Sequence, residues 1–435
     1  MRKNIIIYVL LSLAILVYSS RLTSAETCVK GNCIDGQGVM VYADGGSYEG
    51  SFKEGKFEGK GKRIYEDGRI YEGYFRKGRF EGKGVLTSIN GSKYVGDFSD
   101  GKKNGYGEYV AINGSRYEGT WTNNYYEGKG TQTLEAGDTY IGEFKNGKRE
   151  GYGTMKFVDG RGYAGGWRNN LFNGQGKLVL PSGEMYEGEF KNGRLEGQGV
   201  RTLSNGATYS GEFKFGAVNG KGIFTHPNGE KFEGEFKDGV PEGEGTYTKA
   251  DGGIVVGNFK YGKPDGKGSY RHPDGTRYYG LFKNGVYDGE GTLTMTDGGI
   301  YIGQMKNGKR EGNGEMTFRD GTRYEGEFKN DLFDGKGTLD IPRRGRYKGE
   351  FRAGKFDGYG TFLLSNGITL KGNFRSNQPD GFFTLILRDE SILKGQYKNG
   401  VADGNWSIEK PDGVKSSWDM RNGILNSVTQ ALQGI

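Results

Sequence analysis

The sequence predicts an all-β fold, an elongated single-layer antiparallel solenoid built from consecutive β-hairpins. A 23-residue motif recurs sixteen times without insertion or deletion, so that the glycine of its Tyr-x-Gly element steps regularly from Gly50 to Gly395. The chain has 84 glycines in 435 residues, and most of them fall in fixed columns of the repeat. It also has 29 tyrosines and 25 phenylalanines, an aromatic content that disordered chains lack. Self-similarity at a period of 20 to 50 residues is typical of solenoids.

The first 25 residues differ in composition and predict a secretory signal peptide. Arg2 and Lys3 precede an apolar run at positions 5–18, and small residues follow at Thr23 and Ala25. This run is shorter than the ~20 apolar residues that a membrane-spanning helix needs. We therefore expect export to the periplasm, cell surface or extracellular space with cleavage near Ala25. Retention as a membrane anchor is the alternative.

Residues 26–47 predict an N-terminal half-repeat, because Gly36 and Gly38 match the Gly-x-Gly element of the motif. Cys28 and Cys33 are the only cysteines of the chain. In an oxidising compartment this pair predicts a local disulfide that caps the array. With only two histidines in the sequence, we expect no zinc site.

Residues 48–369 predict the main array, and its first repeat shows the elements in order. Tyr48 begins one strand, Glu54-Gly55 form a two-residue turn, and a second strand runs to position 63 before the closing turn at Asp67-Gly68. The turn column is glycine except where residues that tolerate a positive φ replace it, namely Asn124, Asn170, Asp331 and Asn377. The first glycine of Gly-x-Gly is never replaced, so we expect a close backbone approach there, as between Gly151 and Gly142.

Placing the turn at Glu54-Gly55 predicts the cross-strand pairs Phe52–Phe57, Gly50–Gly59 and Tyr48–Gly61. Strand alternation then puts aromatic residues and glycines on one face and polar residues on the other. We expect the rings of one strand to cover the bare backbone of the next. This aromatic seam is predicted to be the core, with a partly open groove as the alternative. Its candidate residues are Tyr48, Phe52, Tyr71, Phe75, Tyr94, Phe98, Tyr117, Trp121, Tyr140, Phe144, Tyr163, Trp167, Tyr186 and Phe190.

Residues 370–435 predict divergent terminal repeats and a C-terminal cap. Leu370 and Leu393 replace the seam tyrosine, and Phe383 and Trp406 replace the second glycine of Gly-x-Gly. The segment 382–387 is the most apolar part of the chain after the signal peptide. We expect these bulky side chains to cover the open end of the array, as terminal repeats must.

Two charged columns lie on the predicted polar face. The column of Lys53 is basic in 14 of 16 repeats, and the column of Glu58 is acidic in 13, with Asn104, Asn173 and Asn219 in the others. Interleaved solvated charges are our main interpretation, and the asparagines indicate a side chain that bonds local backbone. Calcium binding by the acids is the alternative.

Other functional classes find little support in the sequence. His226 and His272 each enter a closing turn without candidate partners, so we expect no metal or catalytic role for them. Without Arg2, Lys3 and Arg21 the formal charge falls from +7 to +4, too little for a nucleic-acid surface. The Gly-x-Gly elements lack a following Gly-Lys-Ser/Thr, which argues against nucleotide binding. We expect no cofactor.

The pattern Tyr-x-Gly-x-Phe-x-x-Gly-x-x-x-Gly-x-Gly on a 23-residue period resembles the MORN repeat (membrane occupation and recognition nexus). The resemblance covers residues 34 to about 423 and implies a β-hairpin solenoid. MORN repeats accompany junctional membrane proteins, plant phosphoinositide kinases, protist cytoskeletal scaffolds and a lysine methyltransferase, and any catalysis lies in a separate domain. The family is mostly intracellular, so a signal peptide departs from its pattern.

We therefore expect a non-enzymatic, exported scaffold that mediates protein–protein or envelope and surface attachment, with a protein as its partner. One alternative is a module that binds a lipid membrane surface. A second is glycan or peptide binding along an open aromatic groove.

Overall fold

The computed structural model describes residues 26–423, and every regular element in this range is a β-strand. The predicted signal peptide at residues 1–25 and the last residues, 424–435, lie outside the described range. No helix in the part described could cross a membrane. The chain divides into two units, residues 26–181 and 182–423 as described, and each is considered by itself.

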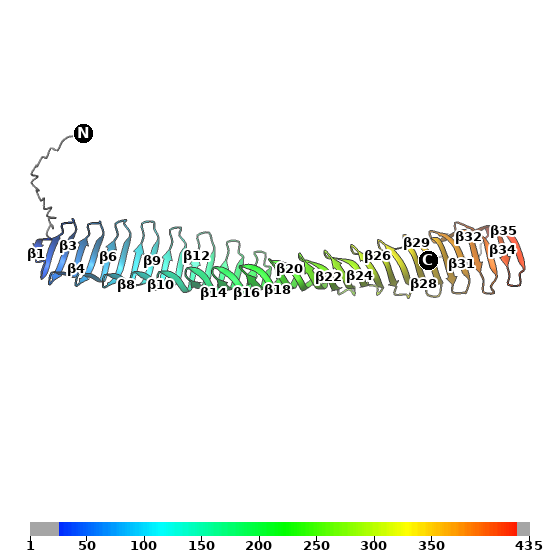
Figure 1. Ribbon diagram of the computed structural model, residues 1–435, viewed down its shortest axis with the longest axis horizontal. Coiled ribbons are helices and arrows are strands. Elements are labelled where there is room, and N and C mark those ends of the chain that lie inside the picture. The colour runs from blue at the N-terminus through cyan, green and yellow to red at the C-terminus, as the bar shows by residue number, and fades with distance from the viewer. Residues whose placement is uncertain (1–25, 424–435) are drawn as a thin grey trace, which may run out of the picture. The chain divides into compact units, whose positions relative to one another are not determined.

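In the first unit, fourteen consecutive strands pair antiparallel, each with the next along the chain (Figure 1). They are β1 (Thr27–Gly31), β2 (Gly36–Val41), β3 (Ser47–Lys53), β4 (Lys56–Ile64), β5 (Ile70–Arg76), β6 (Arg79–Thr87), β7 (Lys93–Ser99), β8 (Lys102–Val110), β9 (Arg116–Thr122), β10 (Tyr125–Thr133), β11 (Thr139–Lys145), β12 (Lys148–Lys156), β13 (Gly162–Arg168) and β14 (Leu171–Val179).

The second unit repeats this arrangement with consecutive antiparallel pairs from β15 to β35. Its strands are β15 (Met185–Lys191), β16 (Arg194–Thr202), β17 (Thr208–Lys214), β18 (Ala217–Thr225), β19 (Lys231–Lys237), β20 (Val240–Thr248), β21 (Ile254–Lys260), β22 (Lys263–Arg271), β23 (Arg277–Lys283), β24 (Val286–Thr294), β25 (Ile300–Lys306), β26 (Lys309–Thr317), β27 (Arg323–Lys329), β28 (Leu332–Ile341), β29 (Gly345–Arg352), β30 (Lys355–Leu364), β31 (Thr369–Arg375), β32 (Gln378–Ile386), β33 (Ile392–Lys398), β34 (Val401–Glu409) and β35 (Lys415–Gly423).

The predicted hairpin turn is confirmed, and both of its residues have a positive φ. Asn146 and Gly147 have φ values of 49° and 78°, which defines a type I′ turn. The asparagine that replaces glycine at position 124 has a φ of 72°. Its side chain also accepts a hydrogen bond from the backbone N–H of Lys103 in the preceding repeat (2.9 Å).

The predicted register is wrong beyond the first pair. Phe52 does lie opposite Phe57, but Gly50 pairs with Gly61 rather than Gly59. Tyr48 accordingly lies opposite Arg63 rather than Gly61. The second strand therefore holds two extra residues in a bulge, where Gly59 has a φ of 64°.

The first glycine of Gly-x-Gly is required for its backbone conformation rather than for the expected close approach. Gly151 has a φ of 68° and pairs with Trp167 of the next strand. Gly142 instead faces Gly153, the second glycine of the element. A Cβ atom at Gly153 would overlap the ring of Tyr140, so this is the column that needs a missing side chain.

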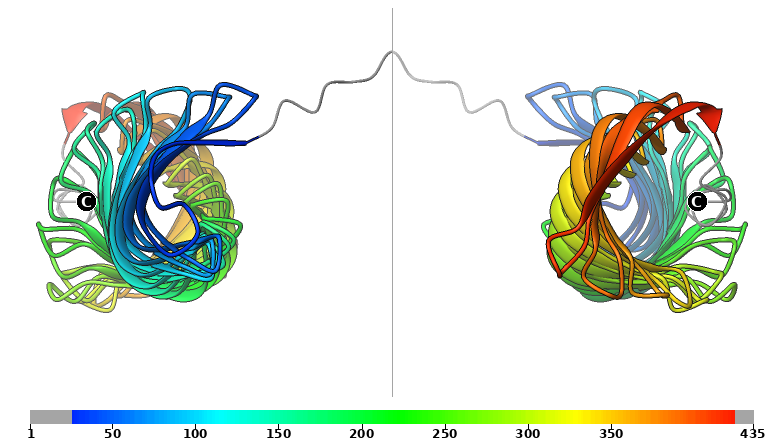
Figure 2. Two further views of the ribbon diagram at one scale, coloured as in Figure 1. Left: turned by 90° about the vertical axis from the view of Figure 1, so that its left-hand side faces the viewer. Right: turned by 90° about the vertical axis from the view of Figure 1, so that its right-hand side faces the viewer.

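Ring-over-glycine packing recurs through both units and forms their cores. The Tyr48 ring lies over the backbone of Gly61, and its hydroxyl donates to the carbonyl of Ser51 (3.0 Å). The same ring stacks on Phe57 with centroids 3.8 Å apart. Seen end-on, the strands of each unit are curved (Figure 2). The buried rings share one face of this single sheet, which we call the inner face.

In the terminal repeats, the ring that covers the glycine comes from the second strand of the hairpin instead of the first. Gly372 lies opposite Phe383, whose ring covers it. Trp406 covers Gly395 in the same way in the next repeat. Leu370 and Leu393 occupy the tyrosine positions of these two repeats and are buried. The ring therefore comes from the facing strand where the tyrosine is missing.

Candidate binding groove

The predicted seam residues lie inside the core rather than on an open surface. All fourteen except Tyr186 are buried. The Tyr186 hydroxyl leaves the seam and donates to the carboxylate of Glu184 (2.5 Å), while Leu195 reaches the glycines of that repeat. Over residues 48–190 the rings therefore fill the inner face of the sheet.

Two residues per repeat fill the inner face of the sheet, namely the seam tyrosine and the side chain at the position of Phe57. In a standard repeat these two rings stack, as Tyr324 and Phe333 do with centroids 3.7 Å apart.

Both members of this pair change in four repeats of the second unit. In the two that contain Leu370 and Leu393, the rings of Phe383 and Trp406 cover the glycines instead. The other two repeats are consecutive and have no such replacement. There, Phe232 occurs in the same repeat as Pro241, which lies opposite Phe236, and Val255 occurs in the same repeat as Pro264, which lies opposite Phe259.

The smaller side chains leave an open apolar groove of about 650 Å³, a volume within the range of ligand sites. Its floor is formed by Phe232, Phe236, Val255, Phe259 and Phe282. Pro241, Pro264 and Tyr287 line one side, together with turn residues that include Gly239, Gly262, Gly285 and Gly308. Phe224, Tyr247, Tyr270 and Lys249 line the other side.

Hydrogen-bond donors lie along the rim of this groove. The Lys249 ammonium lies 4.8 Å from the centroid of the Tyr270 ring. Burial and the nearby carboxylates of Asp251 and Asp274 raise the pKa of Tyr270, so its hydroxyl stays protonated at neutral pH. Burial and Glu230 also raise the pKa of Tyr247, but its hydroxyl already donates to the Glu230 carboxylate, so Lys249 and Tyr270 are the donors on this side. The groove therefore combines an apolar floor with donors for carbonyl or carboxylate oxygens.

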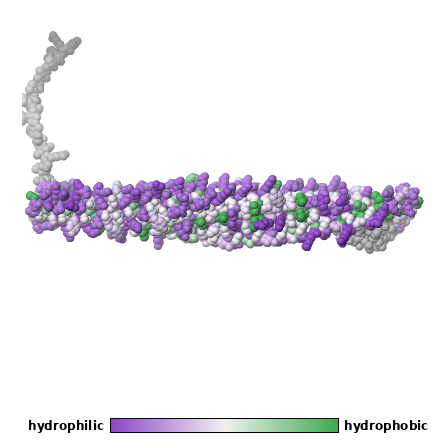
Figure 3. Space-filling view, turned by 90° about the horizontal axis from the view of Figure 1, so that it is seen from below, coloured by the Kyte–Doolittle hydropathy of each residue, from purple (hydrophilic) through white to green (hydrophobic). Residues whose placement is uncertain are grey.

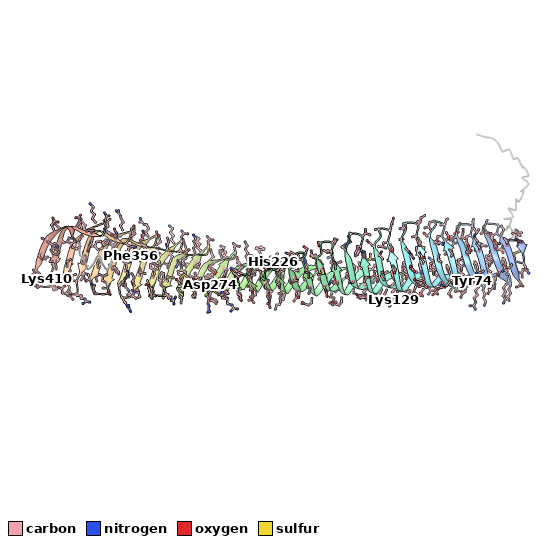
Figure 4. All side chains as sticks on the ribbon, turned by 180° about the vertical axis from the view of Figure 1, so that it is seen from behind. Tyr74, Lys129, His226, Asp274, Phe356 and Lys410 are labelled. Carbon is pink, nitrogen blue, oxygen red and sulfur yellow. A yellow bond between two sulfur atoms is a disulfide. The ribbon has the colours of Figure 1, made fainter. Side chains whose placement is uncertain are left out.

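His272 lies beside the groove rather than in it. Its ring stacks on Tyr270, and the backbone N–H of Asp274 donates to its Nδ1 atom (3.3 Å). His226 accepts the equivalent bond from Asn228 (3.5 Å). Figure 4 labels His226 and Asp274 in this part of the second unit. Both histidines thus support closing turns.

The acidic column has a structural use that the sequence did not reveal. The carboxylate of Glu58 accepts the backbone N–H of Lys77, the first turn residue of the next hairpin (2.9 Å). Glu127 binds Asn146 in the same way, and Asp265 binds Asn284. The asparagine at 219 also accepts this bond, from Asp238 (3.5 Å). The partner therefore belongs to the next hairpin, 19 residues ahead, rather than to local backbone as expected.

The sequence alone does not predict the groove, because the residues that line it occupy ordinary seam and strand positions. The replacement of tyrosine by Phe232 and Val255 is visible in the sequence, as are the prolines at 241 and 264. Only the stacked pair in the structure reveals that the two columns fill one space. Their joint loss, in repeats that keep the second glycine of Gly-x-Gly as Gly245 and Gly268, is the sequence feature that could have identified the groove.

The fold defines the class of this protein as a β-hairpin repeat solenoid. The sequence profile of the MORN repeat matches fifteen segments, at residues 30–47, 48–68, 71–93, 94–116, 117–139, 140–160, 163–185, 186–208, 209–231, 232–254, 256–277, 278–300, 301–323, 324–346 and 347–369. The chain belongs to the MORN repeat family. The hairpins β31–β32 and β33–β34, in which leucine replaces the tyrosine, continue the array beyond the last match.

No curated protein matches the chain in sequence. Among solved structures it is similar to the TCP domain of Drosophila melanogaster SAS-4 in complex with a proline-rich motif of Ana2. That match has 14% identity and a TM-score of 0.24, and it covers 36% of this chain and 85% of the other. The wild-type TCP10 domain of Danio rerio CPAP matches with 13% identity and a TM-score of 0.11, over 72% and 98% of the two chains. At these TM-scores neither likeness bears on function.

Proposed function

We propose that this MORN repeat scaffold is exported, has no enzymatic activity, and attaches a partner protein through the groove of the second unit. The observation that carries the proposal is the 650 Å³ opening at Pro241 and Pro264, where the stacked rings of other repeats are replaced. The occupant we propose is an extended apolar segment of the partner protein. Aromatic-lined grooves bind such segments, and rim donors pair with their carbonyl groups.

The shape of the groove supports a chain-like occupant. Its lining residues come from successive strands, from Phe224 of β18 to the turn residue Gly308, so it runs across the strands. One side is formed by backbone at glycine turns, and the other by Tyr247, Lys249 and Tyr270. No pair of lining residues resembles a nucleophile and its base, which supports binding rather than catalysis.

A variant that fills the groove with residues of the standard repeat tests this proposal. Val255→Tyr/Pro264→Phe recreates the pair formed by Tyr324 and Phe333 and is expected to fold normally. Peptides of twelve residues would be selected from a random library on the natural chain and their affinities measured by calorimetry. We expect apolar peptides to be selected and to lose at least tenfold in affinity for the filled variant.

Val218→Phe is the matched control, because it adds a ring at the same column at a residue that does not line the groove. It is expected to bind the selected peptides as the natural chain does. Equal binding by the filled variant would place the site elsewhere. Preference for a twelve-carbon fatty acid over every peptide would instead assign the groove to acyl chains.

The proposed export has its own test. Mass spectrometry of protein from the native host is expected to find Glu26 as the N-terminus, because Thr23 and Ala25 fit the cleavage positions. An intact segment at residues 1–25 in the mature protein would contradict export by signal cleavage.

A further inference from the structure

Strands β29 to β34 carry three parallel rows of side chains on the outer face of the second unit. The register aligns Lys348, Thr361, Lys371, Thr384 and Lys394 as neighbours on consecutive strands. Two residues along the strands, a middle row begins with the exposed acid Glu350 and continues with Tyr359, Asn373, Phe382 and Gln396. Two residues further lie Arg352, Arg375 and Lys398. We call these three rows the basic face.

Both aromatic residues of the middle row are open to solvent. The exposed fraction is 73% for Phe382 and 58% for Tyr359. Phe382 belongs to the segment that the sequence predicts as a cap, yet its ring points to the opposite side from the buried Phe383. Tyr106 and Tyr152 of the first unit share the column of Tyr359 and are exposed as well, so the rings gain significance only from the cations beside them.

The cations of the basic face are little neutralised by their surroundings. Within the described chain, Lys348, Lys371 and Lys394 make no ion pair, and all three are exposed. Arg352 and Arg375 each lie 3.6 Å from an aspartate of the same hairpin, but their side chains stay 78% and 75% exposed. Exposed pairs of this kind leave most of the charge available.

The basic face is specific to these repeats. The column of Lys348 contains no cation in the first unit, where three of its six residues are glutamates and the others are Val95, Ile141 and Ala164, and it is still Glu325 one repeat earlier. Figure 3 shows that hydrophilic residues cover most of one side of each unit, so hydrophilicity alone does not distinguish the face. What distinguishes it is the change of sign in one column together with two exposed rings.

From this arrangement we propose that the basic face binds a linear anionic polysaccharide. The proposal deepens the proposed function, because it rests on export to a surface where such polymers occur. Successive lysines of the first row are two strands apart, about 9.6 Å, so they meet a polymer that carries charges at regular intervals. Thr361 and Thr384 add hydroxyl groups between them for hydrogen bonds to sugars.

The position of the rings favours a polymer over a bilayer. Tyr359 and Phe382 lie between two rows of longer cationic side chains, about 6.7 Å from each row along the strand. A sugar ring can stack on them while the cations on both sides hold its acidic groups. A bilayer anchor needs its apolar side chains to extend beyond the charged ones, whereas here the cations extend further.

The test measures binding of the full mature chain to polygalacturonate and heparin, with neutral dextran as the uncharged polymer. We expect both acidic polymers to bind, dextran not to bind, and affinity to fall as salt screens the contacts. Lys371→Glu/Lys394→Glu should reduce affinity at least tenfold. Phe382→Ser should reduce it about fivefold with an unchanged salt dependence, because a ring contact is not screened.

Lys191→Glu/Lys214→Glu is the matched control, since it makes the same charge change at exposed positions of the same unit. It should leave affinity within about twofold. Equal loss in both double variants would show unspecific charge attraction and overturn the proposal. Tighter binding to anionic vesicles or to single-stranded DNA through Lys371, Lys394 and Phe382 would also overturn it, as would no binding to either acidic polymer. Unchanged melting temperatures verify that the variants fold.

The groove-filled variant Val255→Tyr/Pro264→Phe separates this inference from the proposed peptide site. It should bind the acidic polymers as the natural chain does. Lost peptide binding with retained polymer binding would support both sites. Retained peptide binding with lost polymer binding in the filled variant would contradict both assignments.

Discussion

At the scale of single residues, each conserved position of the repeat answers a distinct physical demand. The turn glycine provides a left-handed backbone that asparagine can also adopt, as Asn124 does with a φ of 72°. The first glycine of Gly-x-Gly provides another left-handed position at the bulge. The second leaves space for a tyrosine ring. Three glycines in one motif are therefore required for two different reasons.

Substitutions in one repeat should separate these demands. Gly147→Asn should change stability by less than about 0.5 kcal/mol, whereas Gly147→Val should cost about 1–3 kcal/mol because its branched side chain is strained at positive φ. Gly153→Ala should cost about 1–3 kcal/mol by displacing the Tyr140 ring. Gly151→Asn should cost less than Gly153→Ala, since only the end of Glu143 must move. Denaturant unfolding measures all four, and equal effects of Asn and Val at 147 would contradict the assigned turn.

A second residue-scale prediction concerns Lys103, which replaces Phe57 in its repeat. Its ammonium lies 4.9, 4.6 and 4.7 Å from the ring centroids of Tyr94, Tyr109 and Trp121. Burial lowers the pKa of Lys103 to about 8. The unfolded chain, with the ordinary value of 10.5, then binds more protons between these two pH values. Stability from this group should therefore rise with pH from about 8 to 10.5.

The measurement is the difference in unfolding free energy between the natural chain and Lys103→Met across this pH range. Other lysines and tyrosines titrate equally in both and cancel. Lys103→Met should be more stable by about 1 kcal/mol at pH 7, after allowance for partial exposure. That advantage should shrink by pH 10. A difference independent of pH would show that the Lys103 pKa is not lowered.

At the scale of the hairpin, neighbouring repeats are joined at their turns as well as by their strands. The N–H of the second turn residue, Gly147, donates to the carbonyl of Tyr126 in the preceding repeat (2.9 Å). The N–H of the first turn residue donates to the acidic column. Each turn is therefore held by the repeat before it, and this explains why acid or asparagine recurs there.

Variants at Glu127 test this link. Glu127→Ala removes the acceptor for the Asn146 N–H and should destabilise the first unit by about 1 kcal/mol. Glu127→Gln keeps an acceptor oxygen and should cost less than half as much. Hydrogen exchange at Asn146 should accelerate in the alanine variant alone. Equal acceleration in both variants would mean that the charge of Glu127, rather than its acceptor, holds the turn.

The hairpin scale also explains what the sequence could predict. The type I′ turn follows from the glycine and asparagine column, and the aromatic face follows from strand alternation. The register beyond Phe52 and Phe57 could not follow, because a bulge of two extra residues returns every side chain to its original face. The groove could not follow either, because only the structure shows that the columns of Val255 and Pro264 hold rings that stack in other repeats, as Tyr324 and Phe333 do. The basic face needed the alignment of Lys348 with Lys371 across β30.

At the scale of the whole chain, stability is built from neighbour contacts rather than from one core. Each strand pairs only with its neighbours along the sequence within either unit, and each ring packs on the adjoining repeats. Such arrays behave as one-dimensional systems in which a local change propagates weakly. Specialised surfaces can then be placed in a few repeats, as the groove and the basic face are, while the others keep the standard packing.

The disulfide between Cys28 and Cys33 provides a test of this local coupling. It fastens β1 to the segment before β2, and every residue of β1 is exposed, so few packing contacts hold this edge strand without the bond. Reduction should therefore release β1 and weaken β2, with hydrogen exchange rising across residues 27–41. Exchange in the second unit should stay unchanged, because each repeat is stabilised by its own neighbours. Hydrogen exchange measured by mass spectrometry, before and after reduction, decides the question.

Cys28→Ser/Cys33→Ser should reproduce the reduced pattern, which controls for effects of the reductant. Loss of protection in β31–β34 on reduction would mean that the repeats unfold as one cooperative block.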